Sequence, residues 1–396
     1  MSKNNEMLNK INTLRIVFSL FLTSLFLLGA NTAFANDSLA TPMATEHSAE
    51  VTEAHNTTHE ANSEHGEEKF NAGKMILEHV GDSHDWHIAG HLSVPLPVII
   101  YSESGLDIFS SSRFEHGHAA YHSDKTNINY KLEENKVVAI NEDGSVNEEV
   151  TATFYDLSIT KNVATLLFSV ILLCWIFISV AKAYTANPGK APKGLQSFVE
   201  PIIIFIRDDV AKASIGEKKY KKFMPYLLTV FFFIWINNLL GLIPIFPGGA
   251  NLTGNVAVTL TLATLTFIVT VISANKNYWH HIFAMPGVPA WVLIILTPIE
   301  ILGLFLRPFV LMVRLFANIT AGHIIALSFF SLIFIFGEMS TGAGLGFSLF
   351  STAFTVFMMV MELLVAFLQA YVFTLLSAVY FGTAVEEGHH EESHAH

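Results

Sequence analysis

The fold is decided by WVLIILTPIEILGLFLRPFVLMVRLFANITAGHIIALSFFSLIFIF, which occupies residues 291–336. As one continuous helix at ~1.5 Å per residue, it would be about 69 Å long, whereas the hydrocarbon core of a bilayer is about 30 Å thick. A second apolar stretch, residues 345–384, would reach about 60 Å. No polar loop interrupts either stretch, and Pro298 and Pro308 could break or merely bend the first. We therefore expect two long, steeply tilted helices that form an antiparallel hairpin.

A permanent cation lies inside the first stretch. Arg314 is the only fully charged residue between Arg307 and Glu338. A guanidinium cannot lose its proton, and a cation at membrane depth costs at least ~2.5 to 3.5 kcal/mol. Because no acidic residue lies within two helical turns, we expect Arg314 to face a carboxylate from another part of the assembly. A structural cation bonded to backbone carbonyls is the alternative.

The composition is that of a polytopic membrane protein with a soluble appendage. The chain has 396 residues, of which 52% are hydrophobic, and its net charge of −12 comes mainly from the first 150 positions and the last ten. The absence of a basic arm argues against nucleic-acid binding. Cys174 is the only cysteine, which excludes an internal disulfide and a cysteine-based metal cluster.

The N-terminal part of the chain is predicted to be an exported region. Three cations precede an apolar run and the sequence Ala33-Phe34-Ala35, a pattern typical of a signal peptide over residues 1–35. Residues 36–70 are acidic and rich in His, which predicts a disordered segment. Residues 71–160 contain two predicted strands, 94–101 and 137–140, followed by turn residues Asn141 to Gly144, and form an exported soluble region.

A membrane domain is predicted over residues 161–385, with an acidic, His-rich cytoplasmic tail over 386–396. Spans are expected at 163–181, 224–246 and 256–274, which with the two long helices makes five. The loop 182–222 carries nine cations and is therefore cytoplasmic, with an interfacial helix near 198–206. The N-terminus is then exported and the C-terminus cytoplasmic.

Polar residues in the long helices follow a pattern. Glu300, Arg307 and Arg314 recur every seven residues and form one slowly rotating stripe, which Asn318 extends. His323, nine residues after Arg314, falls on the opposite face. If Arg314 lies level with Gln369 in an antiparallel pair, then His323 lies within about a turn of Glu362. Titratable groups on both sides of a fixed cation suggest two offset proton paths with a barrier between them.

Three motifs carry a resemblance to subunit a of the rotary F-type ATP synthase membrane sector. They are the segments RLFANITAGH at 314–323, NNLLGLIP at 237–244 and LQAYVF at 368–373, and the resemblance covers roughly residues 160–385. It implies that residues 161–385 form the membrane ion-channel domain of a proton-translocating stator subunit in a bacterial inner membrane. Such a subunit works with c-ring proteolipids, peripheral-stalk b subunits and the remaining ATP synthase subunits. In some members of the family the acid follows Ala-Gly and the histidine lies on the last helix, so the pair is exchanged here.

The resemblance also implies roles for single residues. Arg314 would be the stator arginine that faces the ring carboxylates, and Glu300 would lie at the inner half-channel. The outer half-channel would be lined by Asn318, His323, Glu362 and Gln369. Each has a structural alternative, such as a buried hydrogen-bonded side chain or, for Glu300 and Arg307, an interfacial pair.

No catalytic residue, cofactor or metal ligand set is expected. The histidines at both ends have irregular spacing, which is typical of solvated sequence. A metal-ion transporter with His-rich termini is the alternative function, and it would need clustered intramembrane ligands. A structural membrane anchor for the exported region is a third possibility, against which charges at several membrane depths argue.

Overall fold

The structure is a computed structural model that describes residues 73, 81–89, 92–133, 135–186, 189–243, 248–285, 288–339 and 341–386. The expected signal peptide and the segment 36–70 lie outside the described residues, as does nearly all of the tail. The described part is mainly helical, with a small region of strands that precedes the helices in the chain.

Within the described residues, five helices are long and apolar enough to cross a membrane, as predicted. Neither Pro298 nor Pro308 breaks the fourth of them, which runs for 50 residues. The hydrogen bonds that these prolines remove leave a bend at most, so the prediction of one long helix per stretch is confirmed. The helices are α4 (Lys161–Ala186), α7 (Tyr220–Leu242), α8 (Val256–Ser273), α10 (Ala290–Met339) and α11 (Thr341–Val385).

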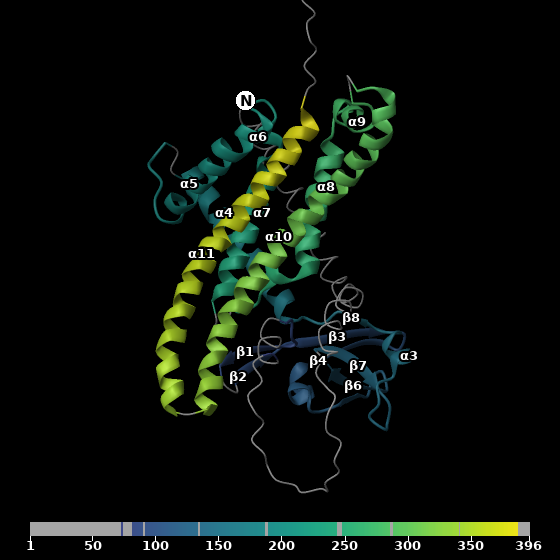
Figure 1. Ribbon diagram of the computed structural model, residues 1–396. Helices are drawn as coiled ribbons and strands as arrows, with labels where there is room; N and C mark the ends of the chain where they lie inside the picture. Colours follow the sequence, from purple (N-terminus) through teal and green to yellow (C-terminus); the bar gives the residue numbers. More distant parts are fainter. Residues whose placement is uncertain are drawn as a thin grey trace, which may run out of the picture.

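Helices α10 and α11 form an antiparallel hairpin that runs obliquely past the other spans (Figure 1). Ring contacts fix its register: the centroids of Phe329 and Phe354 lie 3.8 Å apart, and those of Phe336 and Phe347 lie 4.0 Å apart. The hydroxyl of Ser351 also donates to the carbonyl of Phe329. The same register places Arg314 level with Gln369, which the sequence analysis had assumed.

Helix α7 is the centre of the bundle. Phe231, Phe232 and Phe233 are at most 2% exposed, so three consecutive positions, which point in different directions round the helix, are all covered by protein. The hydroxyl of Tyr226 pairs with that of Thr266 on α8 at 2.8 Å. Such hydroxyl bonds join helices where apolar burial alone gives little net attraction in lipid.

One end of the bundle carries short helices. A helix is present near the predicted residues 198–206: α5 (Leu195–Phe205) continues through the π-helix η2 (Ile206–Lys212) into α6 (Ala213–Ile215). Helix α9 (Lys276–Phe283) lies at the same end, beside the last turn of α11 (Figure 1). There Lys219 Nζ and Asn275 Nδ2 donate to the carbonyl of Val385 at 2.7 and 3.0 Å. These bonds satisfy a helix end that would otherwise leave its carbonyl unpaired.

The strands gather at the opposite end of the bundle (Figure 1). They pair in antiparallel order β1-β2, β4-β3-β8 and β5-β6-β7. Small helices η1 (Ser111–Gly117) and α3 (Glu148–Thr151) connect them. The strands are β1 (Asp85–Ala89), β2 (Leu92–Pro95), β3 (Pro97–Ser102), β4 (Gly105–Ser110), β5 (Tyr121–Ser123), β6 (Ile128–Glu133), β7 (Lys136–Ile140) and β8 (Tyr155–Asp156). We call residues 81–159 the β-region.

The single strand predicted over residues 94–101 is wrong, because the chain changes sheet at Leu96. Pro95 and Pro97 on either side have no N–H, so they cannot continue one ladder. The Leu96 N–H instead lies 3.2 Å from the carbonyl of His84 and 3.0 Å from Ser111 Oγ. The predicted strand at 137–140 is confirmed as β7. A core around Tyr130, Phe114 and Ile100, each fully buried, holds the sheets together.

Candidate functional site

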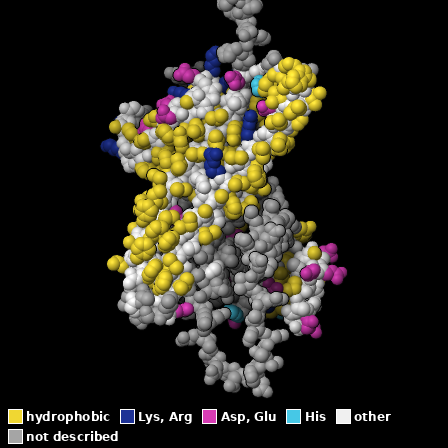
Figure 2. Space-filling view, viewed as in Figure 1, with side chains coloured by type: hydrophobic (Ala, Val, Ile, Leu, Met, Phe, Trp, Pro, Cys, Tyr) yellow, Lys and Arg dark blue, Asp and Glu magenta, His cyan; other side chains and the backbone are white. Residues whose placement is uncertain are grey.

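Arg314 projects from the middle of α10 on an exposed face. Apolar side chains surround it there: Val310 is 43% exposed and Val313 37%. In the described part of the chain, Arg314 has neither a hydrogen bond nor an ion pair. Figure 2 shows isolated basic patches amid the hydrophobic side chains of the long helices. A charge held this way is stable at membrane depth only if a carboxylate or water from outside the chain faces it.

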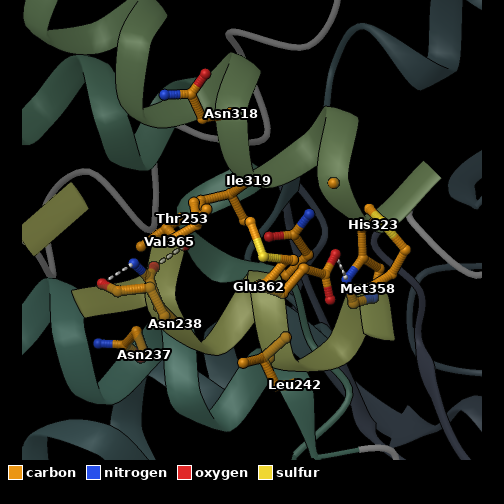
Figure 3. Close-up of a pocket in the computed structure, with 15 residues that line it drawn as sticks. Asn237, Asn238, Leu242, Thr253, Asn318, Ile319, His323, Met358, Glu362 and Val365 are labelled. Carbon is orange, nitrogen blue, oxygen red and sulfur yellow. Dashed lines mark hydrogen bonds and ion pairs between the residues drawn. The ribbon is translucent and has the colours of Figure 1, made fainter. Parts of the chain in front are cut away.

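His323 and Glu362 meet across the hairpin, as the antiparallel register predicted. His323 Nδ1 lies 3.9 Å from Glu362 Oε1, and both side chains are mostly buried. Figure 3 shows the pair inside a pocket between α7, α10 and α11. The distance is too long for a direct hydrogen bond, but one water molecule between the two groups could pass a proton.

The pocket is a cavity of about 90 Å³, enough for a few water molecules. Three buried polar atoms of its lining residues have no hydrogen-bond partner among the described residues: Glu362 Oε1, Asn237 Oδ1 and Asn251 Nδ2. Unpartnered buried polar groups cost free energy unless water satisfies them. The cavity is therefore suited to hold water against a titratable pair, which is the chemistry of a proton path.

Sequence reasoning missed two lining residues on the loop between α7 and α8. Asn251 and Thr253 are 7% and 1% exposed, and both line the cavity. Thr253 Oγ1 donates to Asn238 Oδ1 at 2.5 Å, and Asn238 Nδ2 donates to the carbonyl of Ala366 at 3.1 Å. An Asn-rich loop resembles an ordinary turn in sequence, so only the folded structure reveals its place beside Glu362.

Gly322 makes room for Glu362. A Cβ atom at this position would lie 3.0 Å from Glu362 Oε1. Glycine costs helix stability, so a packing reason at this site is informative.

We expect Gly322→Ala to slow proton uptake through this cavity by up to about tenfold, because a displaced, off-rotamer Glu362 costs ~0.5 to 1.5 kcal/mol. Proton flux in vesicles that contain the complete complex measures the effect. Gly303→Ala on the same helix is the matched control, because a Cβ there meets nothing within 4 Å. Equal flux in the two variants would contradict this role of Gly322.

Asn318 and Gln369 take separate places. Asn318 is exposed and lines the edge of the cavity, where its amide points away from His323 and Glu362 (Figure 3). Gln369 is 5% exposed and does not line the cavity. The structure thus places Asn318 at the cavity, whereas Gln369 lies about one turn beyond the lining residue Ala366, level with Arg314.

A second polar group lies toward the α9 end of the bundle. Arg307 Nη1 donates to the hydroxyl of Tyr278 at 3.3 Å, and its guanidinium lies 5.7 Å from the ring centroid of Tyr380. Burial raises the pKa of Tyr278, and the adjacent Arg307 opposes that rise. Glu300, half-buried, lies two turns before Arg307 on α10. The titratable groups thus fall on both sides of Arg314 along one helix.

A metal site would need several clustered ligands. Among the described residues, no group of three His, Cys, Asp or Glu side chains could hold a metal ion. The His-rich segments of both ends fall almost entirely outside that part of the chain.

Comparisons with known proteins show which family the chain matches. The family described as ATP synthase A chain matches residues 163–382, and a domain of unknown function, DUF8433, matches 75–157. ATP synthase subunit a 2 of Chlorobaculum tepidum is 46% identical over 246 residues, which cover 61% of this chain and 66% of that protein. ATP synthase subunit a of Chloroherpeton thalassium is 43% identical over 249 residues, or 61% and 71% of the two chains. That of Myxococcus xanthus is 39% identical over 248 residues, or 61% and 77%. With more than half of its length matched by the first of these families, the chain belongs to the ATP synthase A chain family.

Proposed function

We propose that this multi-pass membrane protein provides two offset half-channels through which protons reach and leave a rotating ring, and so couples proton flow to ATP synthesis. The observation that carries the proposal is the combination on one hairpin of a water-sized cavity beside His323 and Glu362 with the exposed Arg314. Family membership supports a proton-translocating stator role within the ATP synthase complex of a bacterial inner membrane.

The outer half-channel takes protons through the cavity. Asn318, His323 and Glu362 pass them toward the ring, and Gln369 lies where this path meets Arg314. Histidine titrates near neutrality, and chains of His and Glu in membranes commonly form proton relays. On the other side of Arg314, Glu300 receives protons that leave the ring. Arg307 and Tyr278 hold the neighbouring helices together there.

Arg314 separates the two paths. A fixed cation favours the ionised form of a ring carboxylate that faces it, so that carboxylate gives up its proton before it passes. The same charge repels a proton that would cross directly. The ring must then turn almost fully between uptake and release, driven by ~2.3 kcal/mol per charge per 100 mV. The subunit itself makes and breaks no covalent bond, which fits a non-catalytic role.

The orientation follows from charge. The nine cations of the loop 182–222 put α5, α9 and the end of α11 on the cytoplasmic side. The β-region is then exported, in keeping with a signal peptide over residues 1–35 and domain limits at 71–160 and 161–385. The peripheral-stalk b subunits and the ring proteolipids are the partners we assign, in contact with lipid around them.

Copurification separates this proposal from a metal-ion transporter or a membrane anchor. The intact complex, extracted in mild detergent through a tag on this chain, should contain a small proteolipid that forms a ring and carries one intramembrane carboxylate. Mass spectrometry of the purified complex identifies it. A chain that purifies alone from membranes with active ATP synthase would contradict the proposal.

A further inference from the structure

The β-region touches the membrane helices through a buried indole. Trp86 on β1 is 4% exposed, and its Nε1 donates to the carbonyl of Gly248 at 3.0 Å. Gly248 belongs to the loop between α7 and α8, far from Trp86 in sequence. The bond therefore joins the β-region, which no comparison links to an activity, to the membrane domain.

Hydrogen bonds also tie the residues just before Trp86 to the start of α4. The backbone N–H of Asn162, at the start of α4, donates to Asp82 Oδ1 at 3.0 Å. The N–H of Lys161 donates to the carbonyl of Ser83 at 2.8 Å. These bonds occupy N–H groups at the first turn of α4 that have no partner inside the helix. Residues 82 and 83 are thus tied to α4, and Trp86 follows within a few residues on a paired strand.

The Gly248 carbonyl accepts the indole N–H at a position where the backbone packs too closely for a side chain. A Cβ atom there would lie 2.4 Å from the carbonyl oxygen of Ile243 and 2.6 Å from that of Leu240. No side chain fits at that distance, so this glycine packs its backbone against the end of α7. The backbone N–H of the next residue, Gly249, donates to the carbonyl of Leu240 at 3.2 Å. The carbonyl of Gly248 is consequently held toward Trp86.

The same loop forms one wall of the outer cavity three to five residues later. Asn251 and Thr253 line it, and Thr253 is bonded to Asn238 on α7. On the other side, Thr320 Oγ1 on α10 donates to the carbonyl of Gly254 at 3.4 Å. The loop is therefore held by α7, by α10 and, through Trp86, by the β-region.

We propose that the β-region positions the outer wall of the proton path, with Trp86 holding the loop at Gly248 so that Asn251 and Thr253 stay beside His323 and Glu362. The inference rests on the proposed function, because it gives the β-region a role in the outer half-channel. Trp86 is a positioning residue in this account: it touches no part of the path and acts through the loop.

Trp86→Phe removes the N–H donor and keeps a ring, whereas Trp86→Ala removes both. Trp175→Phe is the matched control, since Trp175 is 62% exposed on α4 and lies outside the site. Complete complexes carrying each variant are reconstituted in vesicles whose lumen corresponds to the exported side, and ATP synthesis is driven by an imposed proton gradient. Hydrogen exchange of residues 248–255 in the same complexes reports on the loop.

The loss of one buried hydrogen bond should raise hydrogen exchange of the loop and lower ATP synthesis by roughly two- to tenfold in Trp86→Phe. The deficit should grow as the luminal pH rises, because proton uptake then limits the rate, and should not depend on the pH outside the vesicles. A merely structural role would lower synthesis equally at every luminal pH.

The inference would be overturned if Trp86→Phe kept the wild-type rates of loop hydrogen exchange and of ATP synthesis. A loss of ATP synthesis that does not depend on luminal pH would also overturn it. If Trp86→Ala does not assemble, the Phe variant carries the test alone. Arg314→Ala in the same vesicles keeps the two claims apart. Normal coupling in Arg314→Ala would refute the proposed function. Loss of coupling in Arg314→Ala, together with wild-type behaviour of Trp86→Phe, would refute the inference alone.

Discussion

Arg314→Ala should abolish ATP-driven proton pumping and open a passive leak while the complex still assembles. Arg314 is exposed and unpaired within the described chain, so its removal leaves no buried partner without a bond. A positive charge about 4 Å away raises the free energy of a passing proton by ~4 kcal/mol at an effective dielectric of 20, so its removal should raise the leak by roughly a thousandfold. Pumping and leak are both measured in vesicles, by quenching of a pH-sensitive dye with and without ATP.

Arg207→Ala is the control for this result. Its guanidinium is paired with Asp208 in η2 at 2.7 Å, outside the spans, so its loss should leave coupling intact. Coupled pumping at the normal rate in Arg314→Ala would show that another group forms the barrier.

Exchange of the cavity pair, His323→Glu with Glu362→His, should recover part of the proton flux that either single change loses. The two side chains lie 3.9 Å apart and line one cavity, so each single change leaves one kind of group in both places. Members of one relay are not additive. The combined His323→Ala, Glu362→Ala variant should therefore cost little more flux than the worse single replacement.

Proton flux in vesicles decides this for the single, double and exchanged variants. Met358, which also lines the cavity, provides a control: Met358→Leu keeps the volume nearly constant and adds no titratable group, so its flux should change less than that of either single variant. An exchange as inactive as the worse single variant, or single losses that simply multiply, would exclude a shared path.

Much of this site could be predicted because it lies on two regular helices. Once Arg314 was taken to lie level with Gln369, the antiparallel direction of the two helices was enough to place His323 within about a turn of Glu362. The exposure of Arg314 followed from the cost of a charge among apolar residues.

The rest depends on packing between distant segments. Asn251 and Thr253 lie on a loop whose path is set by Gly248 against α7 and by Trp86 from the β-region. No periodicity encodes such contacts. The error at Leu96 has a similar origin: two prolines allow one extended run to join two sheets, and the run itself shows only its β propensity.

The central claim is that the face of α10 bearing Arg314 meets the ring, and crosslinking tests it most directly. Val310 and Ala317 lie one turn before and one turn after Arg314 and are both exposed. A photoreactive amino acid at either position, in the intact complex, should crosslink to the small proteolipid next to its intramembrane carboxylate. The same group at Trp175 on α4 should label lipid instead. Crosslinks to the proteolipid from position 175 and none from 310 or 317 would contradict the account.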